Sequence, residues 1–168
     1  MEFVMRKAVP EDIPGIMNIM DSAKTDMDDP DWFVADDEAF VRSHVDGDGF
    51  IVVAESEMNS IAGFFLVKVP RLEENLGTFL DFTEEELEKV LVMDSAAVDR
   101  RYRGNGLQGR MLEAAERMAM PGKYKYLMCT VHPENKYSLQ NMQKHGYEIK
   151  RTVYCYGGLK RHILLKKL

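Results

Sequence analysis

The chain has 168 residues, a length that predicts one domain able to bury a hydrophobic core without disulfide or metal staples. With 45% hydrophobic and 30% charged residues, the composition is ordinary for a globular protein. The formal net charge of -6 argues against a nucleic-acid-binding surface, which needs clustered lysine and arginine. Basic residues do gather around 100–110 and 158–167, so a small anionic ligand remains open.

The cysteines and the hydropathy of the sequence indicate in which compartment we expect the protein. Cys129 and Cys155 are far apart and lack a metal-type spacing, which predicts neither a disulfide framework nor a metal site. Reduced thiols fit the cytoplasm, which is the expected location. No apolar run has the length of a membrane span, and the first residues lack the apolar region of a signal peptide.

The first part of the chain predicts two helices among three strands. A strand is expected over 3–8, a helix over 10–24 with Pro10 in its first position, and a short helix over 37–45. One apolar face of the first helix is formed by Ile13, Ile16, Met17 and Met20. The apolar stretches on either side of Met58-Asn59 predict two strands joined as a hairpin.

The middle of the chain predicts a strand–turn–helix–strand unit. A connection over 71–90 carries a short helix, whose capping box is formed by Thr83 and Glu86. A strand over 91–98 precedes a glycine turn and a helix that Pro121-Gly122 ends, and another strand covers 125–131. Such a unit closes as a right-handed parallel crossover.

The last part predicts a helix over 136–145, ended by Gly146, and a hairpin that turns at Gly157-Gly158. Antiparallel hairpins at both ends and one crossover between them give the fold class. We expect a single-domain α/β fold whose sheet is mixed and mostly antiparallel, with one parallel strand pair and flanking helices.

The glycine turn carries the clearest chemical signal. Its glycines, Gly104, Gly106 and Gly109, match the GxGxxG spacing of dinucleotide-binding turns, and a helix that follows such a turn binds anions with its first amides. A dinucleotide fits poorly, because the next strand ends in Cys129-Thr130-Val131 without an acid for the ribose, and because about 90 residues precede the motif. The Gly-Lys-Ser/Thr ending of a P-loop is missing.

Coenzyme A fits the turn better than a dinucleotide. Arg101, Arg103 and Arg110 surround the turn and would suit a ligand with a pyrophosphate and a further ribose phosphate. The pantetheine arm resembles a peptide strand, and the strand before the turn is placed to offer it an edge.

Two segments resemble motifs of the GNAT superfamily of acyl-CoA-dependent N-acetyltransferases. Val92 to Leu112 resembles the family's motif A, with the Arg-x-x-Gly-x-Gly core at Arg101, Gly104 and Gly106. His132 to Ile149 resembles the motif that follows it in the family, at Asn135, Ser138, Lys144, Gly146 and Tyr147. The order of elements along the whole chain is also GNAT-like.

The resemblance implies acetyl-CoA as co-substrate, no metal, and a set of cofactor contacts. The backbone of Ala96, Ala97 and Val98 would pair with pantetheine, and Asn135 would contact the same arm. The backbone amides that would hold the pyrophosphate are those of Arg103, Gly104, Asn105, Gly106, Leu107 and Gln108. The family usually has a small residue where this chain has Gln108, but only the backbone is needed there.

Two positions concern proton transfer. Asp94 is either a functional residue, as a general base or an anchor for the acceptor amine, or a polar residue on a strand face. Asn135 can cap its helix as well as contact the cofactor. Many family members have a tyrosine where this chain has Met142, which cannot protonate a leaving thiolate. Tyr137 lies about 140° round the helix from Met142, while Tyr154 and Tyr156 belong to a strand that the sequence does not place. The sequence leaves open whether another group or water serves as the acid, or whether the protein has no such acid.

The function expected from these residues is acetyl transfer from acetyl-CoA to a primary amine. The alternatives are a non-catalytic acyl-CoA-binding or sensing module of the same fold, and a structural protein with an empty turn. The acceptor remains open among antibiotics, polyamines, amino acids, protein N-termini and lysines, as does a homodimer. The acidic segment from Asp26 to Asp37, which contains Trp32 and Phe33, either attracts a cationic amine or is a solvated loop.

Overall fold

A computed structural model describes residues 1–47, 49–119 and 122–168 of the chain. The chain divides into two units, the first formed by residues 1–68 and 95–118 and the second by residues 69–94 and 119–168. Strand β4, Val90–Val98, begins in the second unit and ends in the first. The expectation of a single domain remains a prediction.

The first unit is built on an antiparallel sheet. Strands β1 (Phe3–Lys7), β2 (Gly49–Ser56) and β3 (Ile61–Lys68) pair in that order, and Asn59 turns the β2–β3 hairpin with φ 57°. The end of β4 follows β3, and the amide of Asp99 donates to the carbonyl of Ala62. The hairpin around Met58-Asn59 is therefore confirmed.

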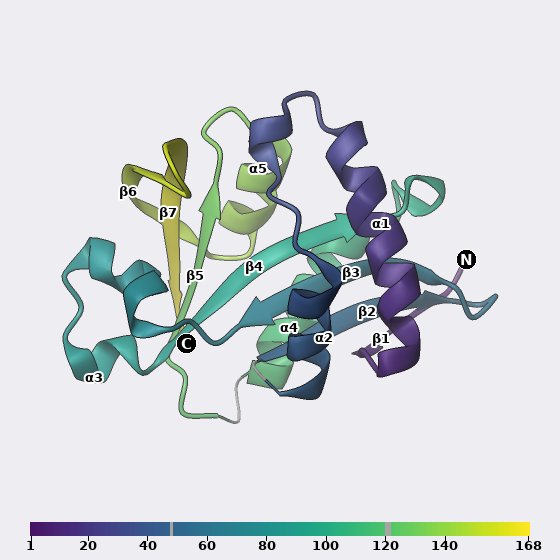
Figure 1. The fold of residues 1–168 in the computed structure, drawn as a ribbon, viewed down its shortest axis with the longest axis horizontal. Helices are drawn as coiled ribbons and strands as arrows, with labels where there is room; N and C mark the ends of the chain where they lie inside the picture. The colour runs from purple at the N-terminus through teal and green to yellow at the C-terminus, as the bar shows by residue number, and fades with distance from the viewer. Residues whose placement is uncertain (48, 120–121) are drawn as a thin grey trace. The chain divides into compact units, whose positions relative to one another are not determined.

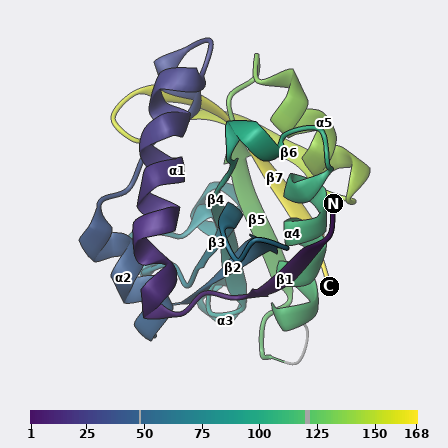
Figure 2. The same ribbon diagram turned by 90° about the vertical axis from the view of Figure 1, so that its right-hand side faces the viewer.

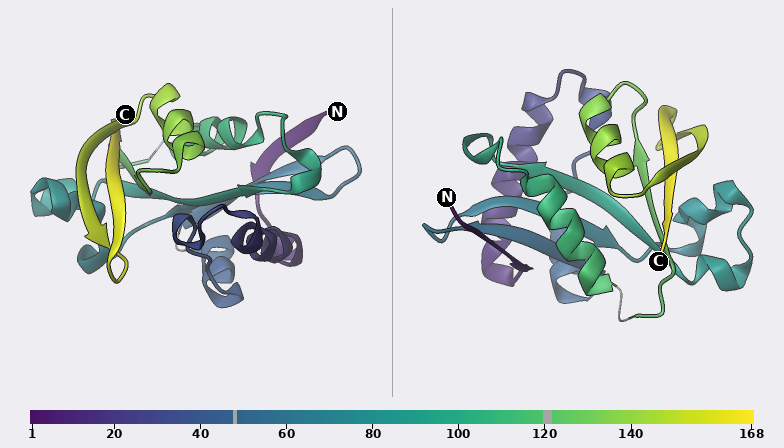
Figure 3. Two further views of the ribbon diagram at one scale, coloured as in Figure 1. Left: turned by 90° about the horizontal axis from the view of Figure 1, so that it is seen from above. Right: turned by 180° about the vertical axis from the view of Figure 1, so that it is seen from behind.

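Helices cover both faces of this sheet (Figures 2 and 3). Helices α1 (Ile13–Asp26) and α2 (Glu38–Asp46) lie on one face, and α4 (Leu107–Ala119) lies on the other. Alternate strand residues face α1 and α2 because side chains of a strand alternate between its two sides. The buried cluster on that face is formed by Ile13, Ile16, Ile19, Met20, Val41, Ile51, Val53, Phe64 and Leu66.

Short 3-10 helices complete the connections. They are η1 (Pro10–Asp12), η2 (Pro30–Trp32), η3 (Leu72–Glu74), η4 (Leu76–Leu80) and, directly after β4, η5 (Arg100–Tyr102). The sequence predicts an α-helix from Pro10, but Pro10 opens η1 and α1 begins at Ile13. The connection over 71–90 contains η3 and η4 besides the predicted helix α3 (Glu84–Leu87). Its predicted capping box of Thr83 and Glu86 is present.

The strands of the second unit follow the order β4-β5-β7-β6 (Figure 1). Strand β5 (Tyr126–Val131) runs parallel to β4, and Val90–Val92 pair with Tyr126–Met128. The last two strands, β6 (Glu148–Cys155) and β7 (Leu159–Lys167), form the predicted hairpin, in which β7 pairs with β5. Helix α5 spans Lys136–Lys144. The mixed, mostly antiparallel sheet with one parallel pair is confirmed, while Pro121 lies outside the described residues.

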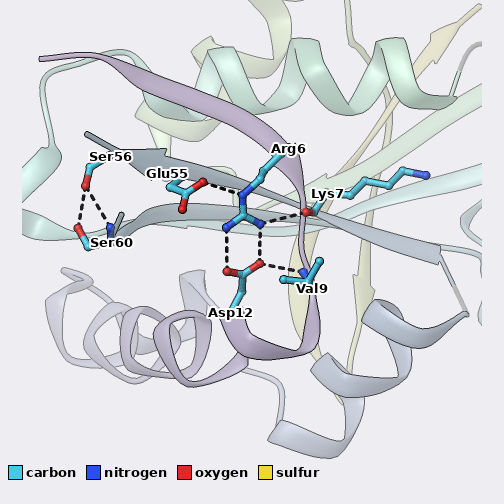
Figure 4. Close-up of polar contacts among 7 residues, drawn as sticks. All are labelled: Arg6, Lys7, Val9, Asp12, Glu55, Ser56 and Ser60. Carbon is cyan, nitrogen blue, oxygen red and sulfur yellow. Dashed lines mark hydrogen bonds and ion pairs between the residues drawn. The ribbon is translucent and has the colours of Figure 1, made fainter. Parts of the chain in front are cut away.

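One ion-pair network ties the start of the chain to the first sheet (Figure 4). The Arg6 guanidinium on β1 donates to both carboxylate oxygens of Asp12, at 2.7 and 3.0 Å, and to Glu55 Oε2 on β2 at 2.8 Å. Asp12 also accepts from the Val9 amide at 2.8 Å. Burial alone would raise the pKa of Asp12, but the bonds from Arg6 and Val9 outweigh it and hold that pKa below its usual value.

Replacement of Asp12 by asparagine should lower the free energy of unfolding by about 2 kcal/mol, because charge-assisted bonds of a buried carboxylate are lost. That loss corresponds to a fall in Tm of about 4–8 °C for a chain of this size. Since the folded pKa of Asp12 lies below its unfolded value, its contribution is complete above about pH 4 and disappears as pH falls through the folded pKa. Thermal melts from pH 7 to pH 2 should therefore converge for the variant and the wild type. Exposed Glu11, replaced by glutamine, is the matched control, and an unchanged Tm for Asp12→Asn would contradict the assignment.

Candidate active site

The turn between β4 and α4 has the backbone that its glycines allow. Gly104 has φ 85° and Gly106 has φ 65°, both in the left-handed region that residues with a Cβ rarely adopt. A Cβ built on either glycine would meet no atom within 4 Å, so both face open space. The turn therefore leaves its backbone accessible to a ligand.

The start of α4 supplies amides to the same place. The first bond of the helix runs from the Arg110 amide to the Gly106 carbonyl, at 3.1 Å. The amides of Leu107, Gln108 and Gly109 precede it, and amides in the first turn of a helix point out along the axis, where they favour an anion. The Leu107 side chain is buried and fixes the helix start. The Arg103 amide already donates to the Arg100 carbonyl, although over a long 3.4 Å.

Hydroxyl groups anchor the chain before the turn. Tyr102 is only 3% exposed, and its hydroxyl lies 2.9 Å from Ser60 Oγ. Ser60 Oγ in turn lies 2.8 Å from Ser56 Oγ in the β2–β3 hairpin (Figure 4). The hydrogen bonds from Ser60 and Ser56 lower the pKa of Tyr102. The Asn105 side chain donates to the Tyr102 carbonyl at 2.9 Å. These contacts hold the turn in one conformation, and no sequence pattern indicates them.

The predicted phosphate ligands among the arginines already have protein partners. Arg101 forms two bonds to Asp99, at 3.1 and 2.8 Å, and these bonds lower the pKa of Asp99. Arg103 donates to Asp26 Oδ2 at 3.1 Å, and Arg110 donates to the Phe3 carbonyl at 3.1 Å. A guanidinium has five N–H donors, so the largely exposed Arg101 and Arg103 retain donors for a phosphate.

The sequence puts Asp26 in an acidic segment, but in the structure its side chain pairs with arginines near the glycine turn. Its side chain, 9% exposed, accepts from both Arg100 and Arg103, so it ties the end of α1 to η5. Asp26 and Arg100 line an open groove of about 340 Å³ together with Ile19, Ser22, Thr25 and Asp99. Asp26 therefore balances the charge of the arginines beside the turn.

The rest of the acidic segment is partly structural. Asp29 accepts from the Asp31 amide and caps η2, and Asp37 accepts from the Phe40 amide and caps α2. Phe33 packs against the buried cluster of the first unit, and Trp32 is half-buried. Asp28 is exposed.

Asp94 lies in β4, two residues after the buried Val92. Val90 and Val92 belong to a buried cluster with Met128 and Ile163, so Asp94, two residues further on, faces the same side of the strand. Asp94 is half-buried. Ser95 points to the other side, and its hydroxyl is buried without a hydrogen-bond partner among the residues that the structure describes. Such an orphaned hydroxyl is a site where a ligand can bind.

Helix α5 shows what the second motif does locally. Asn135 Oδ1 accepts from the Ser138 amide at 3.3 Å, so the predicted capping role is confirmed, whereas its contact with a cofactor remains a prediction. Gly146, with φ 91°, ends the helix, and the Tyr147 amide donates to the Met142 carbonyl at 3.1 Å. Tyr147 and Lys144 thus belong to the helix end, and Met142 is 5% exposed.

The three tyrosines considered as acids differ in their exposure and in their contacts. Tyr137 on α5 is 70% exposed and Tyr154 on β6 is 71% exposed. Tyr156 lies in the turn after β6, and its hydroxyl lies 3.1 Å from Thr130 Oγ1 on β5. No sequence pattern pairs Tyr156 with Thr130, because 26 residues separate them.

Burial keeps both cysteine thiols protonated near neutral pH. It raises the pKa of the Cys129 thiol to about 12, and it also raises the pKa of Cys155. Within the three described ranges, no group of three or more acidic, histidine or cysteine side chains is placed to hold a metal ion. The described helices include none that is both long and apolar enough to cross a membrane.

Comparison with solved structures identifies the fold. An N-acetyltransferase from Staphylococcus aureus Mu50 is similar with a TM-score of 0.78 and 18% identity, over 99% of each chain. A GNAT superfamily phosphinothricin acetyltransferase from Sinorhizobium meliloti, solved with AcCoA, has a TM-score of 0.76 and 17% identity over 100% of this chain and 89% of that one. The NatC complex bound to Gag peptide and CoA contains a chain with a TM-score of 0.74 and 17% identity, over 100% of this chain and 99% of that one.

Sequence comparison identifies the family. No curated protein sequence matches the chain. The profile of the acetyltransferase (GNAT) family matches residues 13–147, which include both motifs and the glycine turn. The chain therefore belongs to the GNAT acetyltransferase family.

Proposed function

We propose that the protein transfers an acetyl group from acetyl-CoA to a primary amine. The observation that carries this proposal is the open left-handed turn at Gly104 and Gly106, followed directly by the first amides of α4. A pyrophosphate needs this combination, because only a backbone without nearby side chains lets it reach several N–H groups at once. Similarity in fold to the Sinorhizobium meliloti enzyme, which was solved in complex with AcCoA, is consistent with the proposal.

The residues of β4 fit the rest of the co-substrate. The backbone of Ala96, Ala97 and Val98 would pair with the pantetheine arm, and the buried Ser95 hydroxyl lies in the same strand without a protein partner in the described part of the chain. From Val98 to Asp94 the strand rises about 13 Å. An arm extended from the turn would therefore bring its thioester toward Asp94, and Asn135 would contact the arm from the start of α5.

Acetyl-CoA supplies an activated thioester, and the protein's contribution is to hold and orient it and to move protons. Holding amine and thioester together removes much of the entropy cost of their encounter. A backbone amide near Val98 would polarise the thioester carbonyl. Asp94, which is half-buried and follows the apolar Val92, would be the base that takes a proton from the amine.

The acceptor belongs to the class of amines. The structures similar to this chain include a phosphinothricin acetyltransferase and the NatC complex bound to Gag peptide, so a small molecule and a protein N-terminus are both candidates. Release of thiol from acetyl-CoA across a panel of amines tests the proposal. Binding of CoA without turnover of any amine would instead support an acyl-CoA-sensing module. A cytoplasmic location remains a prediction.

Valine in place of Gly106 should abolish binding of CoA, because a branched Cβ both strains the left-handed backbone and fills the space in front of the turn. Calorimetry with CoA measures the effect. Gly146→Val is the matched control, since Gly146 has φ 91° and suffers similar strain outside the turn. The control should lose comparable stability and keep its affinity for CoA. Wild-type affinity in Gly106→Val would refute the pyrophosphate assignment.

Asparagine in place of Asp94 should lower kcat/KM by about 100-fold or more, since general bases contribute about 10²–10⁴. A base acts only when deprotonated, so the wild-type rate should rise with pH through the pKa of Asp94, and this acidic limb should vanish in the variant. Exposed Asp21→Asn on α1 is the control. A limb that persists at the same pH in Asp94→Asn would make Asp94 a structural residue.

Polycationic amines should outperform neutral and anionic acceptors if the acidic segment attracts the acceptor. Their KM should rise with added salt, because surface attraction is screened, while the KM of acetyl-CoA should change less. Asp28→Lys should raise the amine KM selectively, and Asp29 and Asp37 are left intact because they cap helices. Glu11→Lys is the control with the same change of charge. A salt-independent amine KM would show that the segment has no role in choosing the acceptor.

A further inference from the structure

Three polar side chains of the second unit interact with one another through a hydrogen bond and an electrostatic effect. Asp94 comes from β4, Thr130 from β5, and Tyr156 from the turn between β6 and β7. The Tyr156 hydroxyl lies 3.1 Å from Thr130 Oγ1, within hydrogen-bond distance. None of the predicted site residues except Asp94 belongs to this group.

Asp94 and Thr130 each lie two residues beyond the last paired residues of the parallel strands. Val90 pairs with Tyr126 and Val92 with Met128, and the ladder of paired residues ends at that second pair. Residues at the same level of a parallel pair face the same side of a sheet. Alternation along each strand puts Asp94 on the side of Val92 and Thr130 on the side of Met128, where the apolar residues are buried.

Tyr156 has an unfavourable backbone conformation at its position beside Thr130. Tyr156 has φ 52°, a left-handed conformation that is unfavourable for a bulky residue, and Gly157 and Gly158 after it have φ 79° and 109°. A strained non-glycine residue persists where the surroundings fix it, and such residues occur often in active sites. The bond to Thr130 is the contact that fixes the Tyr156 ring here.

The surroundings of Tyr156 keep its phenol protonated. Burial of the hydroxyl raises the pKa of Tyr156 to about 12, although the residue as a whole is 51% exposed. The bond from Thr130 and the charge of Arg161 on β7 act the other way. The negative charge of Asp94 raises the pKa further, as does Cys155. Protonation of Asp94 would remove its contribution and make the phenol a better proton donor.

We propose that Tyr156 is the acid that protonates the departing thiolate, and that Thr130 positions it. This inference rests on the proposed acetyl transfer and supplies the group that Met142 cannot provide, since a thioether carries no acidic proton. The amine forms the new C–N bond and gives its proton to Asp94. The C–S bond breaks, its electron pair goes to sulfur, and the sulfur takes the phenol proton. The Asp94 carboxylic acid then returns a proton to the phenolate, so the protein ends the cycle unchanged.

Tyr156→Phe tests the proposal with the full chain and acetyl-CoA. The variant keeps the ring and should retain its Tm and its Kd for CoA, while kcat should fall by about 100-fold, the lower end of what an acid or base contributes. Thr130→Val should lower kcat less. Tyr154→Phe is the matched control in the same hairpin, because Tyr154 is exposed on β6, and it should leave kcat unchanged.

A second measurement needs no amine acceptor. A hydroxyl that donates to the sulfur stabilises a thiolate, so the thiol of bound CoA should titrate at lower pH in the wild type than in Tyr156→Phe, as followed by thiolate absorbance. Unchanged kcat together with an unchanged thiol pKa in Tyr156→Phe would overturn the proposal, as would equal losses in Tyr154→Phe. If the wild type binds CoA but releases no thiol with any amine, acetyl transfer fails. The thiol titration then still decides whether Tyr156 faces the sulfur.

Discussion

The left-handed backbone at Gly104 and Gly106 is the constraint on which the proposed chemistry depends. It reverses the chain between β4 and α4 within a few residues, so the end of a strand and the start of a helix meet at one place. A flexible turn would lose entropy on binding a ligand, but this one is held beforehand by Tyr102, Ser60 and Asn105. If the turn binds a pyrophosphate as proposed, its affinity would depend partly on these contacts, although they do not touch the ligand.

Local charge around this turn is opposite to that of the whole protein. The chain carries a formal net charge of -6, yet four arginines lie between positions 100 and 110. Asp26 and Asp99 pair with three of them, which limits the repulsion among neighbouring guanidinium groups and fixes their side chains. Such exposed pairs contribute little to stability. Their effect is to orient donors that an anionic ligand can share.

Patterns in the sequence predicted the parts of the fold that depend on interactions between residues close together in the chain. The hairpin at Asn59, the capping box of Thr83 and Glu86 and the end of α5 at Gly146 depend on residues close together in sequence, and all three are present. Contacts between distant residues could not be predicted in the same way. Asp26 looks like part of an acidic loop until its arginine partners, 74 and 77 residues away, are known. A motif records residues that are neighbours in sequence. The family motifs could therefore locate the glycine turn proposed to hold the cofactor, but they could not locate Tyr156.

Asp94 and Tyr156 are the groups proposed for the two proton transfers, from the amine and to the sulfur. Val92 and Met128 belong to a buried apolar cluster, and the polar Asp94 and Thr130 follow two residues later on their own strands. A carboxylate and a phenol at such a boundary influence each other's proton affinity, because the charge of one opposes the charge of the other. In the proposed mechanism, a proton that Asp94 takes from the amine would lower the free energy that Tyr156 needs to give its proton to sulfur. The methionine at position 142 is then compatible with the proposed catalysis, since Tyr156 in the turn between β6 and β7 would supply the acid.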